Sequence, residues 1–418
     1  MAEQDPTDKS ARPSLCDATW LKRPETKRAF AALSGDGIET RAVGGAVRDA
    51  LLGLEVADID FATTAAPDKT MARARKAGLK AIPTGIEHGT VTVVADGVAF
   101  EVTTLRRDVE TFGRHATVAF TEDWAEDAAR RDFTLNALYA GPDGTLYDPL
   151  GGYDDLAAGR VRFIGDAEAR IKEDYLRILR FFRFNTYFGR GPLDEAGLSA
   201  CVKLRAGLAQ LSAERVCAEL KRILIAPAAT AAIETLFDYG LLTEILASAP
   251  RLDRFARLID IEAAQGREPS AALRLAALAV FAAEDAPRLA ARLKLSKAEQ
   301  AVLALGADEA LNQDLSDEDA AKRLLYLSGA DSYVSQVLLA WAACGAASDD
   351  AAWQRALVLP QHWEIPVFPL RGPDIMALGD FKGPEIGERL RAVEQHWIDG
   401  GFAADCSELL AKAKALVG

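Results

Sequence analysis

The feature that most constrains the fold is a change in sequence pattern near residue 155. From about residue 40 to 150, short apolar segments of strand type alternate with helical patterns, which predicts a mixed α/β unit. Beyond that point Ala, Leu and Arg dominate and apolar residues recur every three or four positions, which predicts helices. The chain of 418 residues therefore reads as an α+β protein, with an N-terminal α/β unit followed by an all-α remainder.

Several strands and helices can be expected within the N-terminal part. Leu21–Leu33 has the pattern of a short amphipathic helix, and Pro67–Ala77 has the proline start and following glycine of another. An Asp-Gly pair between residues 137–139 and 145–147 predicts a hairpin. The expected strands are Arg41–Val43, Ile59–Thr63, Gly89–Val94, Val98–Leu105 and Val118–Phe120.

Composition narrows the class of protein. Half of the residues are hydrophobic and 27% are charged, which fits neither a disordered chain nor a membrane protein. The polar N-terminus and the lack of a long apolar run favour a cytoplasmic location with no membrane partner. Five scattered cysteines without a C-x-x-C pair predict neither a disulfide framework nor a zinc site. The net charge of −13 argues against nucleic acid, but residues 160–190 carry eight basic and four acidic side chains, so that stretch is locally basic.

The strongest chemical pattern is the run GGAVRDALLGLEVADIDFATTA, which begins at Gly44. Gly44 and Gly45 precede a predicted helix, where backbone N–H groups can approach a phosphate, and Arg48 follows one turn later. Asp58 and Asp60 are two residues apart on a predicted strand, so their carboxylates are expected on one face of the sheet. Such a pair suits Mg²⁺ bound to a nucleoside triphosphate.

A second motif, RRDFTLNALY, begins at Arg130. Asp132 and Asn136 are four residues apart and are expected on one helical face, where they can hold a ribose while Arg131 contacts phosphate. Taken alone, the motif also fits a salt-bridged helix start.

Together these motifs resemble a known family. The Gly-Gly and Asp-x-Asp spacing is similar to that of the DNA polymerase β nucleotidyltransferase superfamily. With RRDFTLNALY, the chain resembles the class II CCA-adding enzymes, or tRNA nucleotidyltransferases, and the related bacterial poly(A) polymerases. The resemblance continues through DPLGGYDDL from Asp148, EDYLR from Glu173 and SAER from Ser212, and more loosely through PLRGPDIMALG and GPEIGERLRAVEQHW.

The resemblance implies a fold and a division of the chain. A polymerase-β-like head with a mixed sheet is expected, followed by an all-α neck, body and tail. The expected segments are a polar lead at 1–19, the catalytic head at 20–150, the neck at 151–225, the body at 226–350 and a tRNA-binding tail at 351–418.

The resemblance also implies a reaction. The 3′-hydroxyl of a tRNA acceptor end would attack the α-phosphate of CTP or ATP, with two Mg²⁺ ions held by Asp58 and Asp60. A third carboxylate is expected on a neighbouring strand, where Glu101 is the candidate and an exposed strand acid is the alternative. No obligate protein partner is evident. Expected contacts with tRNA are Arg180, Arg183 and Arg215.

EDYLR resembles the family's protein template, which selects the nucleotide. Asp174 and Arg177 are three residues apart, so on a helix their side chains would project together and present an acceptor beside a donor. A carboxylate accepts from the exocyclic amine of C and A, and a guanidinium donates to ring acceptors. UTP and GTP would leave these groups unpaired, which favours CTP and ATP.

Two relatives within the family offer alternative functions. Poly(A) polymerases carry a basic run before the third-carboxylate strand, but here that stretch is TGIEHGTVTVV, which favours CCA addition. CC-adding relatives lack a flexible loop that Arg106–Phe120 resembles in full, with Gly113 as hinge and Arg107, Asp108 or Arg114 as lever contacts. Addition of the complete CCA is therefore expected.

Two more distant functions are disfavoured. A catalytically inactive RNA-binding protein should have lost a metal or template residue, yet Asp58, Asp60, Asp174 and Arg177 are all present. A small-molecule nucleotidyltransferase of the aminoglycoside-modifying type has no use for a template pair or a long helical body.

Overall fold

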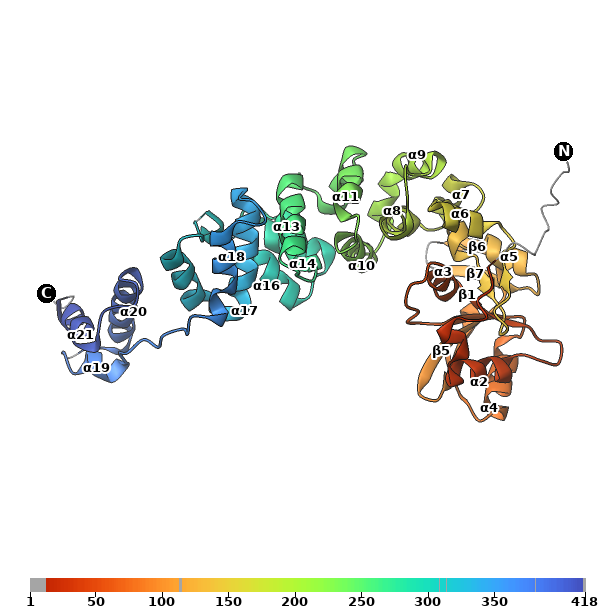
Figure 1. Ribbon diagram of the computed structural model, residues 1–418, viewed down its shortest axis with the longest axis horizontal. Coiled ribbons are helices and arrows are strands. Elements are labelled where there is room, and N and C mark those ends of the chain that lie inside the picture. The colour runs from red at the N-terminus through yellow and green to blue at the C-terminus, as the bar shows by residue number, and fades with distance from the viewer. Residues whose placement is uncertain (1–12, 113–114, 308, 313, 380, 416–418) are drawn as a thin grey trace. The chain divides into compact units, whose positions relative to one another are not determined.

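The computed structural model describes residues 13–112, 115–307, 309–312, 314–379 and 381–415 (Figure 1). The chain divides into two compact units. The first unit holds the chain up to Ala228 together with Asp238–Ile245, and the second holds Ala229–Phe237 and the chain from Leu246 onward. Strands occur in the first unit and the described part of the second is helical, which confirms the expected α+β class.

The first unit is built on a seven-stranded sheet of order β3-β4-β5-β2-β1-β8-β9. β2 pairs with β5 in parallel, whereas the other described pairings of this sheet are antiparallel. A separate hairpin joins β6 to β7. The strands are β1 Thr40–Val43, β2 Asp60–Thr63, β3 Lys80–Gly85, β4 Thr90–Ala95, β5 Val98–Thr104, β6 Arg106–Phe112, β7 His115–Phe120, β8 Tyr139–Ala140 and β9 Leu146–Tyr147.

Helices α2 and α4 contact strands of this sheet and cover its apolar face. Phe30 of α2 packs on Phe61 of β2, with ring centroids 4.6 Å apart, and Phe61 lies 5.4 Å from Phe100 of β5. All three rings are buried, so they form part of the core beneath the sheet. The helical elements of this region are α1 Thr19–Lys22, α2 Pro24–Leu33, α3 Gly45–Leu51, α4 Pro67–Lys76, η2 Ile86–His88, α5 Trp124–Ala129 and η3 Thr134–Asn136.

The remaining helices of the first unit pack on the segment that follows the sheet. Phe133 and Phe163 are 4.8 Å apart between ring centroids, and Phe163 stacks on Phe181 of α8 at 5.5 Å. This aromatic cluster fixes α8 against the residues around η3. The elements are α6 Gly152–Ala158, α7 Ala167–Glu173, α8 Leu176–Phe188, α9 Glu195–Lys203, η4 Arg205–Gln210, α10 Ala213–Leu224 and α12 Leu241–Leu246.

The second unit is helical in all its described elements and contains two apolar clusters. Trp341 stacks on Trp353 in one cluster, and Trp397 packs with Tyr326 in the other. Its elements are α11 Ala229–Asp238, α13 Leu252–Ala264, α14 Ala271–Ala279, α15 Asp285–Leu293, α16 Lys297–Leu305, η5 Glu309–Asn312, α17 Glu318–Cys344, α18 Ala351–Val358, η6 Leu359–Gln361, α19 Gly372–Met376, α20 Gly383–Asp399 and α21 Cys406–Ala415.

The structure corrects some expected elements. The single helix expected over Leu21–Leu33 is two helices, because Pro24 begins a new one and Arg23 before it is extended. β3 and β6 were not expected, and the described residues of the expected flexible loop, 106–112 and 115–120, form the paired strands β6 and β7. Gly113 and Arg114, the expected hinge and one lever contact, lie outside the described residues. Among the described helices, none has the length and apolar content to cross a bilayer.

Candidate active site

A pocket of about 420 Å³ opens in the first unit where the sheet, the RRD motif and α8 meet. Its lining contains most of the residues that the sequence motifs singled out, although these are far apart in the chain. They are Gly44, Gly45, Arg48, Asp60, Arg131, Asp132, Asn136, Asp174, Arg177, Arg180 and Arg215. The lining is completed by Val43, Arg130, Leu176 and Phe184.

The glycine pair forms the wall of the pocket between β1 and α3. Gly44 has a φ of +72°, in the left-handed region that side chains disfavour, and Gly45 begins α3. A Cβ at Gly44 would lie 3.8 Å from Arg131 Nη1, so space is available and the backbone angle is what requires glycine. The turn brings the first residues of α3 to the pocket.

Of the three acidic residues expected to bind metal, Asp60 lines the pocket beside this turn. Asp60 is the first residue of β2 and lies opposite Glu101 in the parallel register with β5. The pKa of Asp60 is raised to about 6, first by loss of hydration, then by the negative charges of Glu101 and Asp58, while Arg131 opposes the shift. Asp60 and Glu101 are nevertheless exposed to solvent, so Asp60 lies at the mouth of the pocket.

The carboxylates fit a divalent cation in charge and donor type, because a bound cation would relieve their mutual repulsion. Within the described residues, however, His, Cys, Asp and Glu side chains do not gather into a group of three or more around one metal position. Asp58 precedes β2, whereas Asp60 is its first residue, so the expectation that both lie on one strand is wrong. Glu101 and Asp58 do not line the pocket as Asp60 does.

The RRD motif is not a helix, contrary to the expectation for Asp132 and Asn136. Phe133 between them is extended and Asn136 ends the short η3, because the Asp132 carboxylate accepts a hydrogen bond from the Phe133 N–H (2.9 Å) and so competes with helix formation. The two side chains meet all the same, since Asn136 Nδ2 donates to Asp132 Oδ1 at 3.0 Å.

This pair belongs to a continuous set of polar contacts from α3 to α8. Arg48 Nη1 donates to Asn136 Oδ1 at 2.7 Å, and Arg180 Nε donates to Asp132 Oδ2 at 2.7 Å. Arg48 is mostly buried and its guanidinium lies 4.1 Å from the ring centroid of Phe188. Burial tends to raise the pKa of Asp132, but the charge of Arg180 and the hydrogen bonds from Asn136 and Arg180 outweigh this effect. The pKa is therefore below its usual value and the carboxylate is ionised. Asp132 and Asn136 are thereby locked in one orientation.

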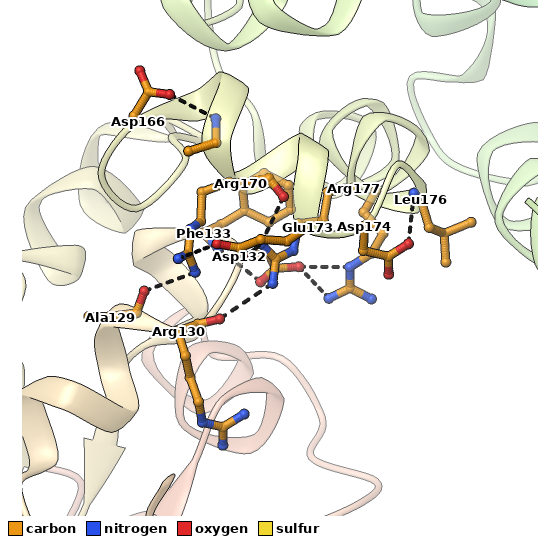
Figure 2. Close-up of polar contacts among 12 residues, drawn as sticks. Ala129, Arg130, Asp132, Phe133, Asp166, Arg170, Glu173, Asp174, Leu176 and Arg177 are labelled. Carbon is orange, nitrogen blue, oxygen red and sulfur yellow. Dashed lines mark hydrogen bonds and ion pairs between the residues drawn. The ribbon is translucent and has the colours of Figure 1, made fainter. Parts of the chain in front are cut away.

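The template residues also differ from the expected shared helix. Asp174 lies in the break between α7 and α8 with an extended backbone, and its Oδ1 accepts from the Leu176 N–H at the start of α8 (Figure 2). Arg177 is the second residue of α8 and donates to Glu173 and to the carbonyl of Arg170. Asp174 pairs instead with Arg215 of α10, whose Nη2 is 2.6 Å from Oδ2. Both template side chains face the pocket, each with another partner.

Comparisons with known proteins decide the family. A family model described as the poly A polymerase head domain matches residues 40–162, and one described as the probable RNA and SrmB-binding site of polymerase A matches residues 192–255. The mitochondrial CCA tRNA nucleotidyltransferase 1 of Mus musculus is 36% identical over 404 residues, covering 90% of this chain and 86% of that protein. The chain belongs to the CCA-adding enzymes.

Other CCA-adding enzymes agree in sequence and fold. That of Lacticaseibacillus paracasei is 31% identical over 404 residues, covering 93% of this chain and 96% of that protein. A crystal structure of the Bacillus stearothermophilus CCA-adding enzyme in complex with CTP has a TM-score of 0.72 at 28% identity, covering 94% of this chain and 98% of that chain. The likeness therefore extends through both compact units of this CCA-adding enzyme.

The three arginines expected to contact tRNA have internal partners in this CCA-adding enzyme. Arg180 is paired with Asp132, and Arg215 with Asp174. Arg183 does not line the pocket, and its Nε lies 3.0 Å from Oε2 of the buried Glu219. Arg183 is mostly buried, which leaves little of its surface for RNA.

Sequence reasoning missed several residues of the site. Asp127 is buried and bonded to both arginines of the RRD motif, and its spacing of four residues from Arg131 was the available signal. Glu173 holds Arg177 from the same distance along the chain. Phe184, which lies 5.1 Å from the guanidinium of Arg180, carried no signal beyond its apolar position on a helix.

Proposed function

We propose that this enzyme completes the 3′ end of tRNA by adding CCA from CTP and ATP, using one pocket for both nucleotides. The observation that carries this proposal is the convergence of a glycine turn, a metal-type carboxylate and the template pair on one cavity. The crystal structure of the Bacillus stearothermophilus relative is a complex with CTP, which supports a nucleotide substrate for this chain.

In the proposed reaction the RNA 3′-hydroxyl attacks the α-phosphate, a new phosphodiester bond forms and pyrophosphate departs. Asp58 and Asp60, with Glu101 beside them, are the residues that would hold Mg²⁺. When bound, Mg²⁺ lowers the pKa of the attacking hydroxyl and neutralises charge on the leaving group. Arg131 lies near both the glycine turn and Asp60, where its positive charge can bind the triphosphate.

Base selection is assigned to Asp174 and Arg177. Arg215 and Glu173 hold these two side chains in place without using all their hydrogen-bonding capacity, since a carboxylate has about four acceptor sites and a guanidinium five donors. The remaining acceptor of Asp174 can take the amine shared by C and A, and a free N–H of Arg177 can donate to the ring. Asp132 and Asn136 are proposed to contact the ribose.

The direct test supplies the purified chain with a tRNA transcript that ends at the discriminator base, together with Mg²⁺ and labelled CTP and ATP. We expect three added nucleotides ending in A. Long A tails would instead identify a poly(A) polymerase, arrest after two C residues would identify a CC-adding enzyme, and no addition at all would contradict nucleotidyl transfer.

Two further assignments follow from the family and belong to the proposal. We assign tRNA binding to the tail at 351–418, to be tested by tRNA affinity after substitution of its exposed basic residues. We also propose a cytoplasmic location, with which five free cysteines are compatible because disulfides are rare in that reducing compartment. The mouse relative is named as mitochondrial, so cell fractionation against a mitochondrial marker is the deciding measurement.

A further inference from the structure

Asp127 is a buried carboxylate that the proposed reaction leaves without a role. It lies in the last turn of α5, and its side chain is 1% exposed. It accepts from Arg130 Nη2 at 2.7 Å, from Arg131 Nη2 at 3.1 Å and from Tyr139 Oη at 2.8 Å. It does not line the nucleotide pocket, although both of its arginine partners do.

Arg131 is held from two sides by this arrangement. Its Nη2 bonds to Asp127 and its Nε donates to Tyr139 Oη at 3.3 Å. Tyr139 is itself rigid, because β8 pairs with both β1 and β9 and the ring packs on Trp124 at 5.2 Å. The guanidinium of Arg131 is therefore fixed beside the glycine turn and close enough to Asp60 to lower its pKa.

The charge of Asp127 makes this placement possible. Arg130 and Arg131 are neighbours in sequence and both are mostly buried. Without an anion between them, the two positive charges would repel each other and the side chains would turn towards solvent. Burial tends to raise the pKa of Asp127, but the charges of Arg131 and Arg130 lower it below its usual value. The carboxylate is thus ionised at neutral pH and balances one of the two cations.

We propose that Asp127 is a positioning residue for nucleotidyl transfer, which acts through Arg131 by holding that guanidinium against the triphosphate, near both the glycine turn and Asp60. Asp127 does not contact the nucleotide. The inference rests on the proposed function, since it presumes a nucleoside triphosphate in the pocket.

The test compares Asp127→Asn, Arg131→Ala and the double variant in the full chain, by steady-state addition to tRNA. For Asp127→Asn we expect KM for CTP and for ATP to rise by similar factors, about tenfold or more, as for loss of a charge-assisted contact. Discrimination against UTP should not change, because Asp174 and Arg177 are untouched. The double variant should have the KM of Arg131→Ala alone, whereas multiplied effects would overturn the proposal.

A matched control separates positioning from helix stability. Asp123 caps the N-terminus of the same helix through the Ala125 N–H and bonds to neither arginine. Asp123→Ala should lower the melting temperature and leave both KM values within twofold of wild type. If it raises KM as much as Asp127→Asn does, the effect belongs to α5 stability and the inference fails.

Two further outcomes are informative. If Asp127→Asn does not fold, as judged by circular dichroism, Asp127→Glu replaces it. Glutamate keeps the negative charge, but its additional methylene moves the carboxylate and so displaces the two arginines. A folded Asp127→Glu with unchanged KM would contradict the proposal. A wild-type chain that adds no nucleotide refutes the proposed function, whereas an active wild type with insensitive Asp127 variants refutes only this inference.

Discussion

At the scale of single residues, the negative charges around Asp60 have a cost to the stability of the folded chain. The raised pKa of Asp60, about 6, means that the folded protein binds this proton more tightly than the unfolded chain does. Stability contributed by the proton is present below the unfolded pKa near 4 and is lost as the pH rises through about 6. Ionised Asp60 therefore destabilises the metal-free protein at neutral pH.

Asp60→Asn should accordingly remove activity and raise the melting temperature in EDTA at pH 7.5 by a few degrees, about 1–4 °C once solvent screening is considered. The gain should vanish at about pH 3 and below, where the wild-type carboxyl is protonated in both states. Differential scanning calorimetry at the two pH values measures this, with the exposed Glu122→Gln as control. A melting temperature of Asp60→Asn below that of wild type at neutral pH would show that ionised Asp60 does not destabilise the folded protein.

The template assignment makes a different prediction for Arg177. Arg177→Ala removes the donor proposed to read C and A, so discrimination against UTP should fall by about tenfold or more while the fold persists. Competition between CTP and UTP during addition to tRNA measures this ratio. Arg222→Ala is the control, since that residue is exposed and outside the pocket. Unchanged discrimination would remove Arg177 from the template.

Residue identity was easier to predict than residue geometry. The spacing of Gly44 and Asp60 pointed to a phosphate and metal site because the required backbone, a tight turn and a strand start, follows from local sequence. Asp132 and Asp174 were expected on helices because four- and three-residue spacings suggest one. In the structure both aspartates bond to nearby backbone N–H groups, and this local competition with the helix is not visible in a periodic pattern.

At the scale of elements, close approach between backbones fixes the position of η3. A Cβ at Gly152, the first residue of α6, would lie 2.1 Å from the carbonyl oxygen of Thr134 in η3. Gly152→Ala should therefore destabilise the first unit by about 1–3 kcal/mol or more, as overpacking does. Gly387→Ala is a matched contrast, since it lies within α20 with nothing within 4 Å.

Gly387→Ala should stabilise the second unit by up to about 1 kcal/mol, because alanine restricts the unfolded chain and favours the helix. Urea unfolding followed by circular dichroism gives both midpoints. Equal midpoints for Gly152→Ala and wild type would mean that α6 moves away from η3 without a loss of stability.

Elements with their own strong pattern were predicted, and those that depend on neighbours were not. β4 and β5 follow from alternating apolar residues, and the strand pair at Tyr139 and Leu146 follows from its Asp-Gly turn. β3 was missed because Pro83 disfavours a strand and its residues are only partly buried at the sheet edge. β6 was not expected, because Arg106–Phe120 resembles the flexible loop of the family and the pairing of β6 with β7 cannot be read from the segment alone.

At the scale of the whole molecule, the nucleotide pocket lies entirely within one of the two compact units. We therefore expect calorimetry to resolve two unfolding transitions, of which saturating CTP raises only one. At 100 times Kd the stabilisation is about 2.7 kcal/mol for the unit that binds. A single transition shifted as a whole would show that the two units unfold together.

The overall charge was the least informative whole-molecule property. The chain carries −13 formally, yet the pocket is lined by six arginines and three aspartates. A sum over the chain cannot reveal this, because the arginines come from segments separated by more than 150 residues and are assembled by folding. The charge that a nucleotide meets is therefore positive in a protein that is acidic on average.

Asp174 and Arg177, which we propose as the template, lie at the break before α8 and in its first turn, and this assignment has a consequence for the order of addition. A nucleic-acid template advances by one base at each step, whereas Asp174 and Arg177 present the same two groups every time. On this assignment, the number of nucleotides already added is set by the length of the RNA, because the two side chains are the same at each step. We therefore expect that a tRNA released after two additions can be completed by any other copy of the enzyme.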